Sequence, residues 1–369
     1  MGTIAVDEKT KQELGRYGFD EAALEAFARR VREAVSSNAV KGTLVPPAPE
    51  DVTPLAPLGS AERRRLREKG LESVARGEVG VVVLAGGMAT RFGGVVKAVV
   101  PALDSLSFLE CKWQDISLLA KVGRGVKTLV MSSYATHEAI VAHATERLGP
   151  GAIEVFPQFV SLRLSPDGSL FRDDEGAPSP YATGHGDLSF ALRRSGQLAR
   201  FRAAGGKLLM MSNVDNLGAT VDPAIVGFHL ERGASLTAEV VRKEPGDKGG
   251  APARLDGRPQ IIEGFRFPKG FDQDSIPVFN TNTFVLDAAA IDRDFELPYY
   301  RVEKTVDGRP AIQFERLVGE LTAFLPTAFV EVEREGADGR FLPAKDPDEL
   351  LRRVSSIRQV VGSRRSLEG

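Results

Sequence analysis

From Val79 onward, short apolar runs alternate with longer stretches whose apolar residues recur at helical spacing. This alternation is typical of a mainly parallel β-sheet with helices on its faces. The predicted strands are Val79–Leu84, Lys127–Met131, Lys207–Met211, Leu236–Val241 and Val278–Val285. We therefore expect an α/β fold, in which ligands bind at the carboxyl ends of the strands.

The first 78 residues predict a helical arm that precedes the sheet. Asp20 is placed to cap its helix. The apolar positions of that helix are Leu24, Phe27, Val31 and Val35. A proline-rich connector at Val45–Pro57, too stiff and polar for the core, leads into a charged helix at Ala61–Arg76. We expect this arm to pack against the rest of the chain.

Two further helices carry the signature of a capping Asp followed by proline at the first helical position. One begins near Asp222–Pro223. The other follows Asp346–Pro347, and we expect it to span Leu350–Val361. The stretch from Arg242 to Pro277 is rich in Gly, Pro and charge, which predicts a hairpin or lid over the sheet.

Composition narrows the class of protein. The 369 residues are 42% hydrophobic and 27% charged, as in ordinary globular proteins, and 48 basic against 50 acidic residues give a net charge of −2. That balance argues against nucleic-acid and electrostatic membrane partners. The single cysteine, Cys111, excludes an internal disulfide framework. Since no apolar run approaches the ~18–20 residues of a membrane span and no signal-peptide pattern begins the chain, we expect a cytoplasmic protein.

The apolar run Val79–Leu84 ends in a glycine-rich turn. Gly86 and Gly87 follow it directly, and Arg91 and Lys97 lie at the same mouth. Accessible backbone N–H groups beside two cations predict a site for a nucleotide or a sugar phosphate. The spacing matches neither a P-loop nor the Gly-x-Gly-x-x-Gly pattern of dinucleotide sites. A turn made only for tight packing is the alternative.

The segment from Leu84 to Gly93, with Lys97 after it, resembles the loop of the eukaryotic-type UDP-sugar pyrophosphorylases, Leu-x-Gly-Gly-x-Gly-Thr-Arg-x-Gly followed by Pro-Lys. Ala89 replaces a loop glycine and Val96 replaces the proline. Segments similar to this family continue in its order over residues 65–355. They are Met131–Glu138, Phe156–Gln158, Gly184–Asp187, Asn213–Asp222, Asn280–Asn282 and Arg340–Lys345.

The resemblance implies a Rossmann-like mixed sheet flanked by helices, as in nucleotidyltransferases with a GT-A-like fold. It implies a helical N-terminal arm (1–78), a catalytic domain (79–345) and a short C-terminal helix and tail (346–369). Many members of the family continue into a C-terminal β-helix domain. Only 24 residues follow Lys345, so we expect that domain to be reduced or absent. We expect a monomer or a weak homo-oligomer.

The resemblance also implies roles for individual residues. The nucleotide-binding positions are Leu84, Ala85, Gly86, Gly87, Met131, Gln158, Gly184, Asn213 and Asp215. The catalytic cations, which would neutralise phosphate oxygens, are Lys97, Lys345 and Arg91. The sugar phosphate would be held by His185, Glu263 and Asn280. A phosphate dianion is already a nucleophile near pH 7, so His185 is not required as a general base.

Asp215 is the expected metal ligand. It follows the apolar run Leu208–Met211, at the carboxyl end of a predicted strand. A carboxylate is a hard oxygen ligand suited to Mg²⁺ that bridges phosphates, so Mg²⁺ is the expected cofactor. An Asp in an Asx-turn is the alternative for this residue taken alone.

Together these residues predict a Mg²⁺-dependent uridylyltransferase that forms UDP-glucose and pyrophosphate from UTP and glucose 1-phosphate. Gly184–Asp187 and Asn213–Asp222 favour the glucose branch. Leu84–Gly87, with Gly70–Leu71 and Gly77–Glu78 before it, is more similar to the N-acetylhexosamine branch, so other sugar 1-phosphates stay open. A glycosyltransferase that uses a UDP-sugar would need Asp215 but no loop built for a triphosphate. An inactive nucleotide-sugar sensor would fit the two departures, Ala89 and Val96.

Overall fold

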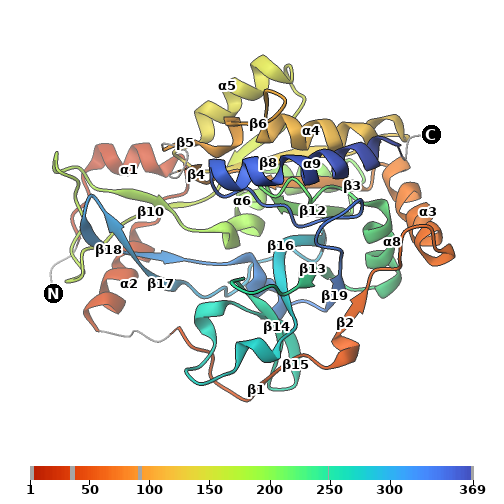
Figure 1. The fold of residues 1–369 in the computed structure, drawn as a ribbon. Helices are drawn as coiled ribbons and strands as arrows, with labels where there is room; N and C mark the ends of the chain where they lie inside the picture. Colours follow the sequence, from red (N-terminus) through yellow and green to blue (C-terminus); the bar gives the residue numbers. More distant parts are fainter. Residues whose placement is uncertain (1–3, 34–37, 90–93, 248, 367–369) are drawn as a thin grey trace.

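The computed structural model describes residues 4–33, 38–89, 94–247 and 249–366 (Figure 1). Its centre is an eight-stranded sheet. In spatial order the strands are β2 (Val52–Pro54), β19 (Thr327–Glu331), β13 (Leu236–Arg242), β16 (Val278–Asp287), β12 (Leu208–Asn213), β3 (Val79–Leu84), β8 (Lys127–Ser132) and β9 (Glu154–Pro157). Neighbouring strands are parallel except at β16, which is antiparallel to both β13 and β12. The predicted mixed α/β sheet is confirmed, and all five predicted strands belong to it.

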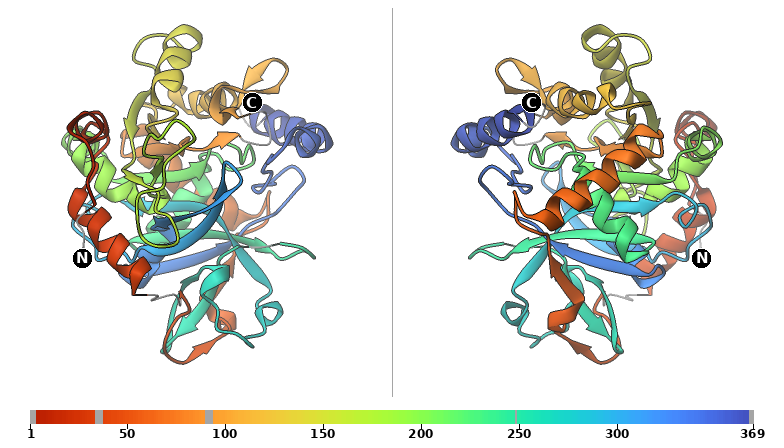
Figure 2. Two further views of the ribbon diagram at one scale, coloured as in Figure 1. Left: turned by 90° about the vertical axis from the view of Figure 1, so that its left-hand side faces the viewer. Right: turned by 90° about the vertical axis from the view of Figure 1, so that its right-hand side faces the viewer.

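Residues along β3 alternate between two cores. Val79, Val81 and Val83 pack on one face of the sheet, and Val82 and Leu84 on the other. The first face is covered by α3 (Ala61–Ala75), α4 (Phe108–Ser117), α5 (His137–Arg147), α8 (Pro223–Arg232) and α9 (Pro347–Ser366). The second face is covered by α6 (Leu188–Arg194) and α7 (Gln197–Ala203) (Figure 2). Burial on both faces explains why β3 is an unbroken apolar run.

Helices α3 and α8 touch through glycines. A Cβ on Gly70 of α3 would lie 1.8 Å from the carbonyl oxygen of Pro223, and one on Gly227 of α8 would lie 1.9 Å from that of Leu66. Only glycine lets the two backbones approach this closely. Asp222 caps α8 as predicted, since its side chain accepts a hydrogen bond from the N–H of Ala224. The two helices lie side by side in the right-hand view of Figure 2.

The N-terminal arm contributes to two sheets. β1 (Leu44–Val45) pairs with β14 (Ala251–Leu255), and β2 extends the edge of the central sheet beside β19. The expectation that Val45–Pro57 is only a connector is therefore wrong for Val45, which belongs to β1, and for Val52–Pro54. The sequence does not predict β2, because proline is ordinarily a signal against strands and is tolerated only at a sheet edge such as this one.

The other two helices of the arm are α1 (Glu8–Gly15) and α2 (Glu21–Arg32). They share a hydrophobic cluster that is separate from the two cores of the central sheet. The predicted cap is present, because the Asp20 carboxylate accepts from the N–H of Ala23. Leu24, Phe27 and Val31 are buried against neighbouring strands, whereas Val35 lies outside the described residues. Those strands are β10 (Val160–Leu162) and β18 (Arg309–Glu315).

The stretch from Arg242 to Pro277 contains the predicted hairpin, in which β14 pairs with β15 (Arg258–Ile262). The last helix begins at Pro347, and the Asp346 carboxylate accepts from the N–H of Glu349. It extends to Ser366, past the predicted end. The other short strands are β4 (Met88–Ala89), β5 (Val95–Val96), β6 (Pro101–Leu103), β7 (Leu106–Ser107), β11 (Pro180–Ala182) and β17 (Tyr300–Val306). Among the helices described, none has the length and apolar character to cross a bilayer.

We expect the substitution Gly227→Ala to lower the free energy of unfolding by about 2–3 kcal/mol, since its methyl group would force α3 and α8 apart. Urea denaturation measures this change. Gly15→Ala is the matched control, because a Cβ there meets nothing within 4 Å, and it should leave stability unchanged or slightly higher. Equal effects of the two substitutions would contradict the packing argument.

Candidate functional site

Four parallel strands end at one edge of the sheet, where their following turns are linked by backbone hydrogen bonds. After β3, Ala85 donates to the carbonyl of Met131 at 2.8 Å. After β12, Val214 donates to the carbonyl of Leu84 at 3.0 Å, and after β9, Gln158 donates to that of Ser132 at 2.9 Å. The structure thus brings the predicted nucleotide-binding segments together at the carboxyl edge.

Gly86 makes room for the side chain of Gln158. A Cβ on Gly86 would lie 2.2 Å from Nε2 of Gln158. The Gln158 side chain is buried under the loop, with its residue only 6% exposed. Gly87, by contrast, has open space where a Cβ would be. The absence of a side chain at Gly86 therefore leaves space for the amide of Gln158 beside the end of β3.

Lys97 and Asp215 form an ion pair at the centre of this edge. Lys97 begins the 3₁₀ turn η3 (Lys97–Val99), and its Nζ lies 2.8 Å from Oδ2 of Asp215. The same Nζ lies 5.7 Å from the centroid of the Phe108 ring. Both side chains are largely buried, so the attraction is weakly screened. The third predicted cation, Arg91, lies outside the described residues.

Backbone and side-chain hydrogen bonds hold the segment that carries Lys345 against residues 215 and 216. Ala344 donates its N–H to the backbone carbonyl of Asp215 at 3.1 Å. The Asn216 amide donates to the carbonyl of Arg340 at 3.1 Å and accepts from the N–H of Leu342 at 2.8 Å. Lys345 itself is exposed. The backbone of the second predicted cation is therefore held next to Asp215, with its side chain toward solvent.

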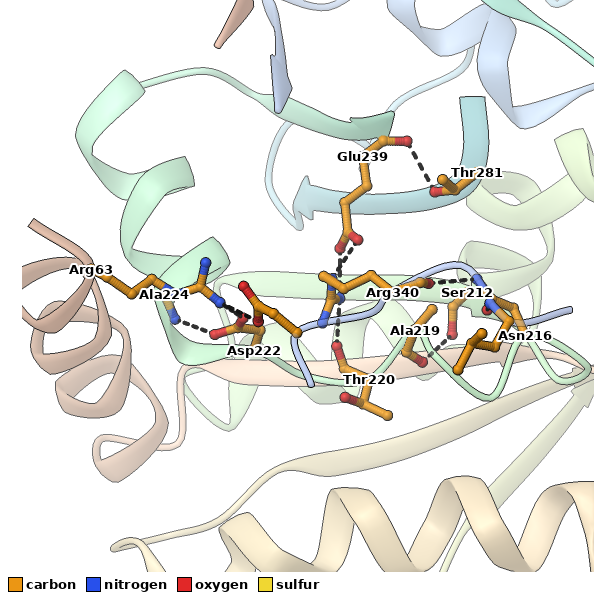
Figure 3. Close-up of polar contacts among 12 residues, drawn as sticks. Arg63, Ser212, Asn216, Ala219, Thr220, Asp222, Ala224, Glu239, Thr281 and Arg340 are labelled. Atoms are coloured by element: carbon orange, nitrogen blue, oxygen red, sulfur yellow. Dashed lines mark hydrogen bonds and ion pairs between the residues drawn. The ribbon is translucent and has the colours of Figure 1, made fainter. Parts of the chain in front are cut away.

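A buried ion pair anchors this segment from behind (Figure 3). The Arg340 guanidinium binds both carboxylate oxygens of Glu239, at 2.6 and 2.8 Å, and donates to the carbonyl of Thr220 at 2.8 Å. Glu239 is fully buried in β13 and Arg340 is 2% exposed. On its backbone side, the Glu239 carbonyl accepts from Thr281 Oγ1 at 2.9 Å.

Sequence reasoning assigned no role to Asn216, Glu239 or Arg340. Asn216 and Arg340 lie inside segments that the resemblance singled out, so a search for structural partners could have reached them. Glu239 carried a stronger signal, since it is a charged residue in the middle of the apolar strand Leu236–Val241. A buried charge needs a partner.

A bulge in β16 connects the two sides of the site. The pairing of β13 with β16 shifts register between Glu239 and Val240. Asn282 lies in this bulge in the left-handed conformation, with φ of 57°. Its side chain donates to Oδ1 of Asn213 at 3.0 Å, and its N–H donates to Oδ1 of Asn280. The bulge thus turns the Asn280 and Asn282 side chains toward the end of β12.

The Gly-His-Gly-Asp turn has a packing reason that the sequence did not show. A Cβ on Gly184 or Gly186 would lie 2.5 or 2.4 Å from the backbone of Arg316 and Leu317. Gly184 also has a φ of 99°. The two glycines are therefore required for the close packing of this turn against residues 316 and 317. The buried Asp187 carboxylate binds Arg316 and accepts from the N–H of Phe159, which ties the turn to the Gln158 segment.

His185 is held as a neutral hydrogen-bond donor. Its Nδ1 accepts from the N–H of Val318 at 3.1 Å, and burial lowers the pKa of its imidazole to about 4. The proton of the neutral ring therefore lies on Nε2, which can donate to a ligand.

Glu263 lies near His185, across the turn η8 (Val318–Ala323). Its carboxylate packs on Gly319 and Gly250, and Gly250 accepts from the N–H of Asn280. All three predicted sugar-phosphate residues therefore lie around Gly250 and η8. Burial raises the pKa of the Glu263 carboxyl to about 7, an effect that the nearby Glu320 reinforces and Arg266 opposes.

Known proteins are similar to this chain in both sequence and fold. The family model described as UTP–glucose-1-phosphate uridylyltransferase matches residues 23–365. The chain belongs to this family. The Solanum tuberosum UTP–glucose-1-phosphate uridylyltransferase is 30% identical over 331 residues, 83% of this chain and 66% of that protein. The Saccharomyces cerevisiae protein of the same name is 29% identical over 299 residues, 74% of this chain and 58% of that protein. The matched part of the chain thus spans less than two thirds of each of these two relatives, 66% and 58% of their lengths.

Solved structures of the same fold are also similar to this uridylyltransferase-family chain. The uridine diphosphate N-acetylglucosamine pyrophosphorylase from Trypanosoma brucei superposes with a TM-score of 0.74 at 19% identity, over 94% of this chain and 79% of that one. A mutant UDP-glucose pyrophosphorylase from Leishmania major, in complex with UDP-glucose, gives 0.71 at 21% identity, over 93% and 77%. These similarities confirm the fold.

The described residues offer magnesium one carboxylate, so the other oxygen ligands would have to come from substrate phosphates and water. Among the described residues there is no group of three or more His, Cys, Asp or Glu side chains that could hold a metal. Asp215 is a lone carboxylate beside Lys97. Magnesium is commonly bound by one or two carboxylates together with substrate phosphates and water, and one carboxylate fits that pattern.

The raised pKa of Glu263 predicts a pH-dependent stability. Between its unfolded value of 4.5 and about 7, the folded chain binds this proton more tightly, so the free energy of unfolding falls as pH rises. Glu263→Gln removes the titration. Relative to the native chain, we expect the variant to gain stability between pH 5 and pH 8, as measured by urea unfolding at each pH. The exposed Glu296→Gln serves as control. A pH slope unchanged in Glu263→Gln would disprove the assignment.

Proposed function

We propose that this chain is a uridylyltransferase that forms UDP-glucose and pyrophosphate from UTP and glucose 1-phosphate. One observation carries the proposal: Lys97 and the segment bearing Lys345 converge on Asp215 at the carboxyl edge of the sheet. Two anionic substrates must meet for this reaction, so a carboxylate paired with one lysine, beside the backbone of a segment that carries a second lysine, suits it. The names of the relatives agree with this proposal.

In the proposed reaction a phosphate oxygen of glucose 1-phosphate attacks the α-phosphorus of UTP in line. A new P–O bond forms as the bond to the β-phosphate breaks, and pyrophosphate leaves. Lys97 and Lys345 bind phosphate oxygens as point charges and hold the two anions together. His185 donates from Nε2 to the sugar phosphate, and no side chain needs to remove a proton.

Gln158 and Glu263 would orient the two ends of the substrates. The buried amide of Gln158 can both donate to and accept from the imide edge of uracil. Glu263, with a pKa of about 7, can donate to or accept from a sugar hydroxyl. Asp215 would hold Mg²⁺, which supplies charge neutralisation at the phosphate oxygens.

Pyrophosphate release measures the proposed activity. We expect release with UTP, Mg²⁺ and glucose 1-phosphate, and none with ATP, GTP, CTP or dTTP. The panel includes N-acetylglucosamine 1-phosphate, because Leu84–Gly87 is similar to the loop of that branch. Release only with the N-acetylhexosamine would keep the chemistry and correct the sugar. No release from folded protein with any pair would overturn the proposal.

Asp215→Asn should lower turnover at least ~10²-fold, because the site loses the carboxylate that positions Lys97 and the metal. The Asn keeps the volume and the backbone carbonyl that binds Ala344, so the fold should survive. Asp274→Asn is the matched control, since it makes the same chemical change at a side chain that is 98% exposed. Near-native rates in Asp215→Asn would show that the site is wrongly assigned.

The close approach of Gly86 and Gln158 gives a second test of the nucleotide site. The methyl group of Gly86→Ala would displace the Gln158 amide, which can move because it ends a flexible side chain. We expect the dissociation constant for UTP to rise about tenfold, or ~1.4 kcal/mol, in isothermal titration calorimetry. Gly87→Ala, with open space around its Cβ, should change UTP binding much less. Equal losses in both variants would argue against a role for Gln158.

A further inference from the structure

A cavity of about 710 Å³ lies away from the candidate site. It is enclosed by α3, the turn η4 (Leu118–Lys121), the start of α8 and the loop at residues 337–340. None of Lys97, Gln158, Asp215, His185 or Glu263 lines it. Its volume is in the range of pockets that enclose a small organic ligand.

The lining is apolar with a cationic excess. The apolar side chains are Leu58, Leu71, Leu118, Leu119, Val122 and Val221. Five cationic and three anionic side chains accompany them: Arg63, Arg64, Arg67, Lys121 and Arg340 with Asp115, Asp222 and Asp338. Two of the carboxylates, Asp222 and Asp338, are already bound by the buried Arg63, at 2.7 and 2.8 Å. The charge of Arg340 is balanced by Glu239 behind the wall. Five cations therefore face four anions, and the excess of one positive charge favours an anionic group in the cavity.

Arg67 is the cation best placed to receive that anion. It lies half-buried on α3 at the cavity wall. In the part of the chain that the structure describes, its guanidinium forms no hydrogen bond or ion pair. Arg340, by contrast, is fully engaged by Glu239 and Thr220. A half-buried guanidinium beside an apolar surface is suited to a carboxylate, sulfonate or phosphate with an apolar body.

The wall of the cavity includes residues of the buried ion-pair network that holds the Lys345 segment (Figure 3). Thr220, Asp222 and Arg340 line the cavity. Thr220 and Asp222 end the segment that begins with Asn213 and Asp215, and Arg340 begins the segment that ends with Lys345. A ligand packed on this wall contacts both segments that the buried ion pair holds together.

We propose that this cavity is a binding site for a small amphipathic anion, whose charged group pairs with Arg67 and whose occupancy tightens substrate binding at the carboxyl edge of the sheet. The first part stands on the cavity alone, and the second rests on the proposed function. The direction follows from the contacts, since a ligand that fills the space beside Val221 restrains the segment that carries Asp215. Linkage requires the effect to be mutual, so UTP must tighten the anion in the same proportion.

Binding is tested on the full chain without substrates. The probe is 8-anilinonaphthalene-1-sulfonate, an apolar aromatic body with one sulfonate, titrated by its fluorescence. N-phenyl-1-naphthylamine is the uncharged match. We expect saturable binding of one sulfonate probe per chain, and weaker binding of the uncharged probe. Arg67→Gln should weaken the sulfonate probe about tenfold and leave the uncharged probe unchanged.

Two further variants locate the probe. Ala337→Trp, from an exposed position on the rim, should block the cavity and abolish binding of both probes. Arg352→Gln is the matched charge control, because Arg352 is an exposed arginine of α9 that does not line the cavity. It should bind both probes as the native chain does. Circular dichroism confirms that each variant is folded.

The sign of the linkage decides between this cavity and the nucleotide site. Saturating UTP should lower the dissociation constant of the probe about fivefold, and saturating probe should lower the dissociation constant of UTP, measured by calorimetry, by the same factor. Competition between UTP and the probe, with no effect of Arg67→Gln, would place the probe at the nucleotide site and overturn the proposal. Failure of the proposed enzymatic activity would leave the fluorescence result standing.

A second copy of the chain is the other possible occupant of this surface. We expect sedimentation velocity, across a range of protein concentrations, to give the same association state for the native chain and for Ala337→Trp. A dimer that Ala337→Trp disrupts, together with absence of saturable probe binding, would show that the surface is an interface and overturn the small-anion proposal.

Discussion

The buried ion pair of Glu239 and Arg340 is the interaction on which the geometry of the site depends. Removing two charges from water is unfavourable by several kcal/mol for each ion, and their attraction offsets this only in good geometry. Here both carboxylate oxygens are bound, and the guanidinium has a further acceptor in the Thr220 carbonyl. An arrangement that left either charge unpaired would be strongly destabilised, so the loop carrying Arg340 has one position relative to β13.

The position of that loop sets the position of Lys345. Asn216 binds the backbone of residues 340 and 342, and Asp215 accepts from Ala344. On its other side Glu239 accepts from Thr281, in the bulge that presents Asn280 and Asn282. One buried carboxylate in the central sheet therefore connects the segments that carry Asp215 and Lys345 with the bulge that carries Asn280 and Asn282. These links use backbone groups and side-chain amides, so they occupy neither the ammonium group of Lys345 nor Nε2 of His185.

The sequence was sufficient for the features that depend on local pattern. Short segments rich in apolar and β-branched residues located β3, β8, β12, β13 and β16. Asp caps located α8 and α9. Neither signal needs a distant partner. The edge strand β2 was missed, since its pairing with β19 gives no periodic signal over three residues. The packing reason for Gly184 and Gly186 was also out of reach, because it requires the backbone of residues 316 and 317, some 130 positions away. Residues of the site could be named by motif, but the partner that fixes them, Glu239, could not.

The ion pair of Lys97 and Asp215 shows how such a site can be organised before a ligand arrives. Two opposite charges 2.8 Å apart largely cancel at a distance, so the edge of the sheet does not present a bare cation. An incoming phosphate must compete with a carboxylate for Lys97, and a cation must compete with Lys97 for the carboxylate. A phosphate that arrives with its own divalent cation exchanges both partners at once and leaves neither charge unpaired. For the proposed uridylyltransferase, we therefore expect the site to bind a nucleotide together with its divalent cation better than either component alone.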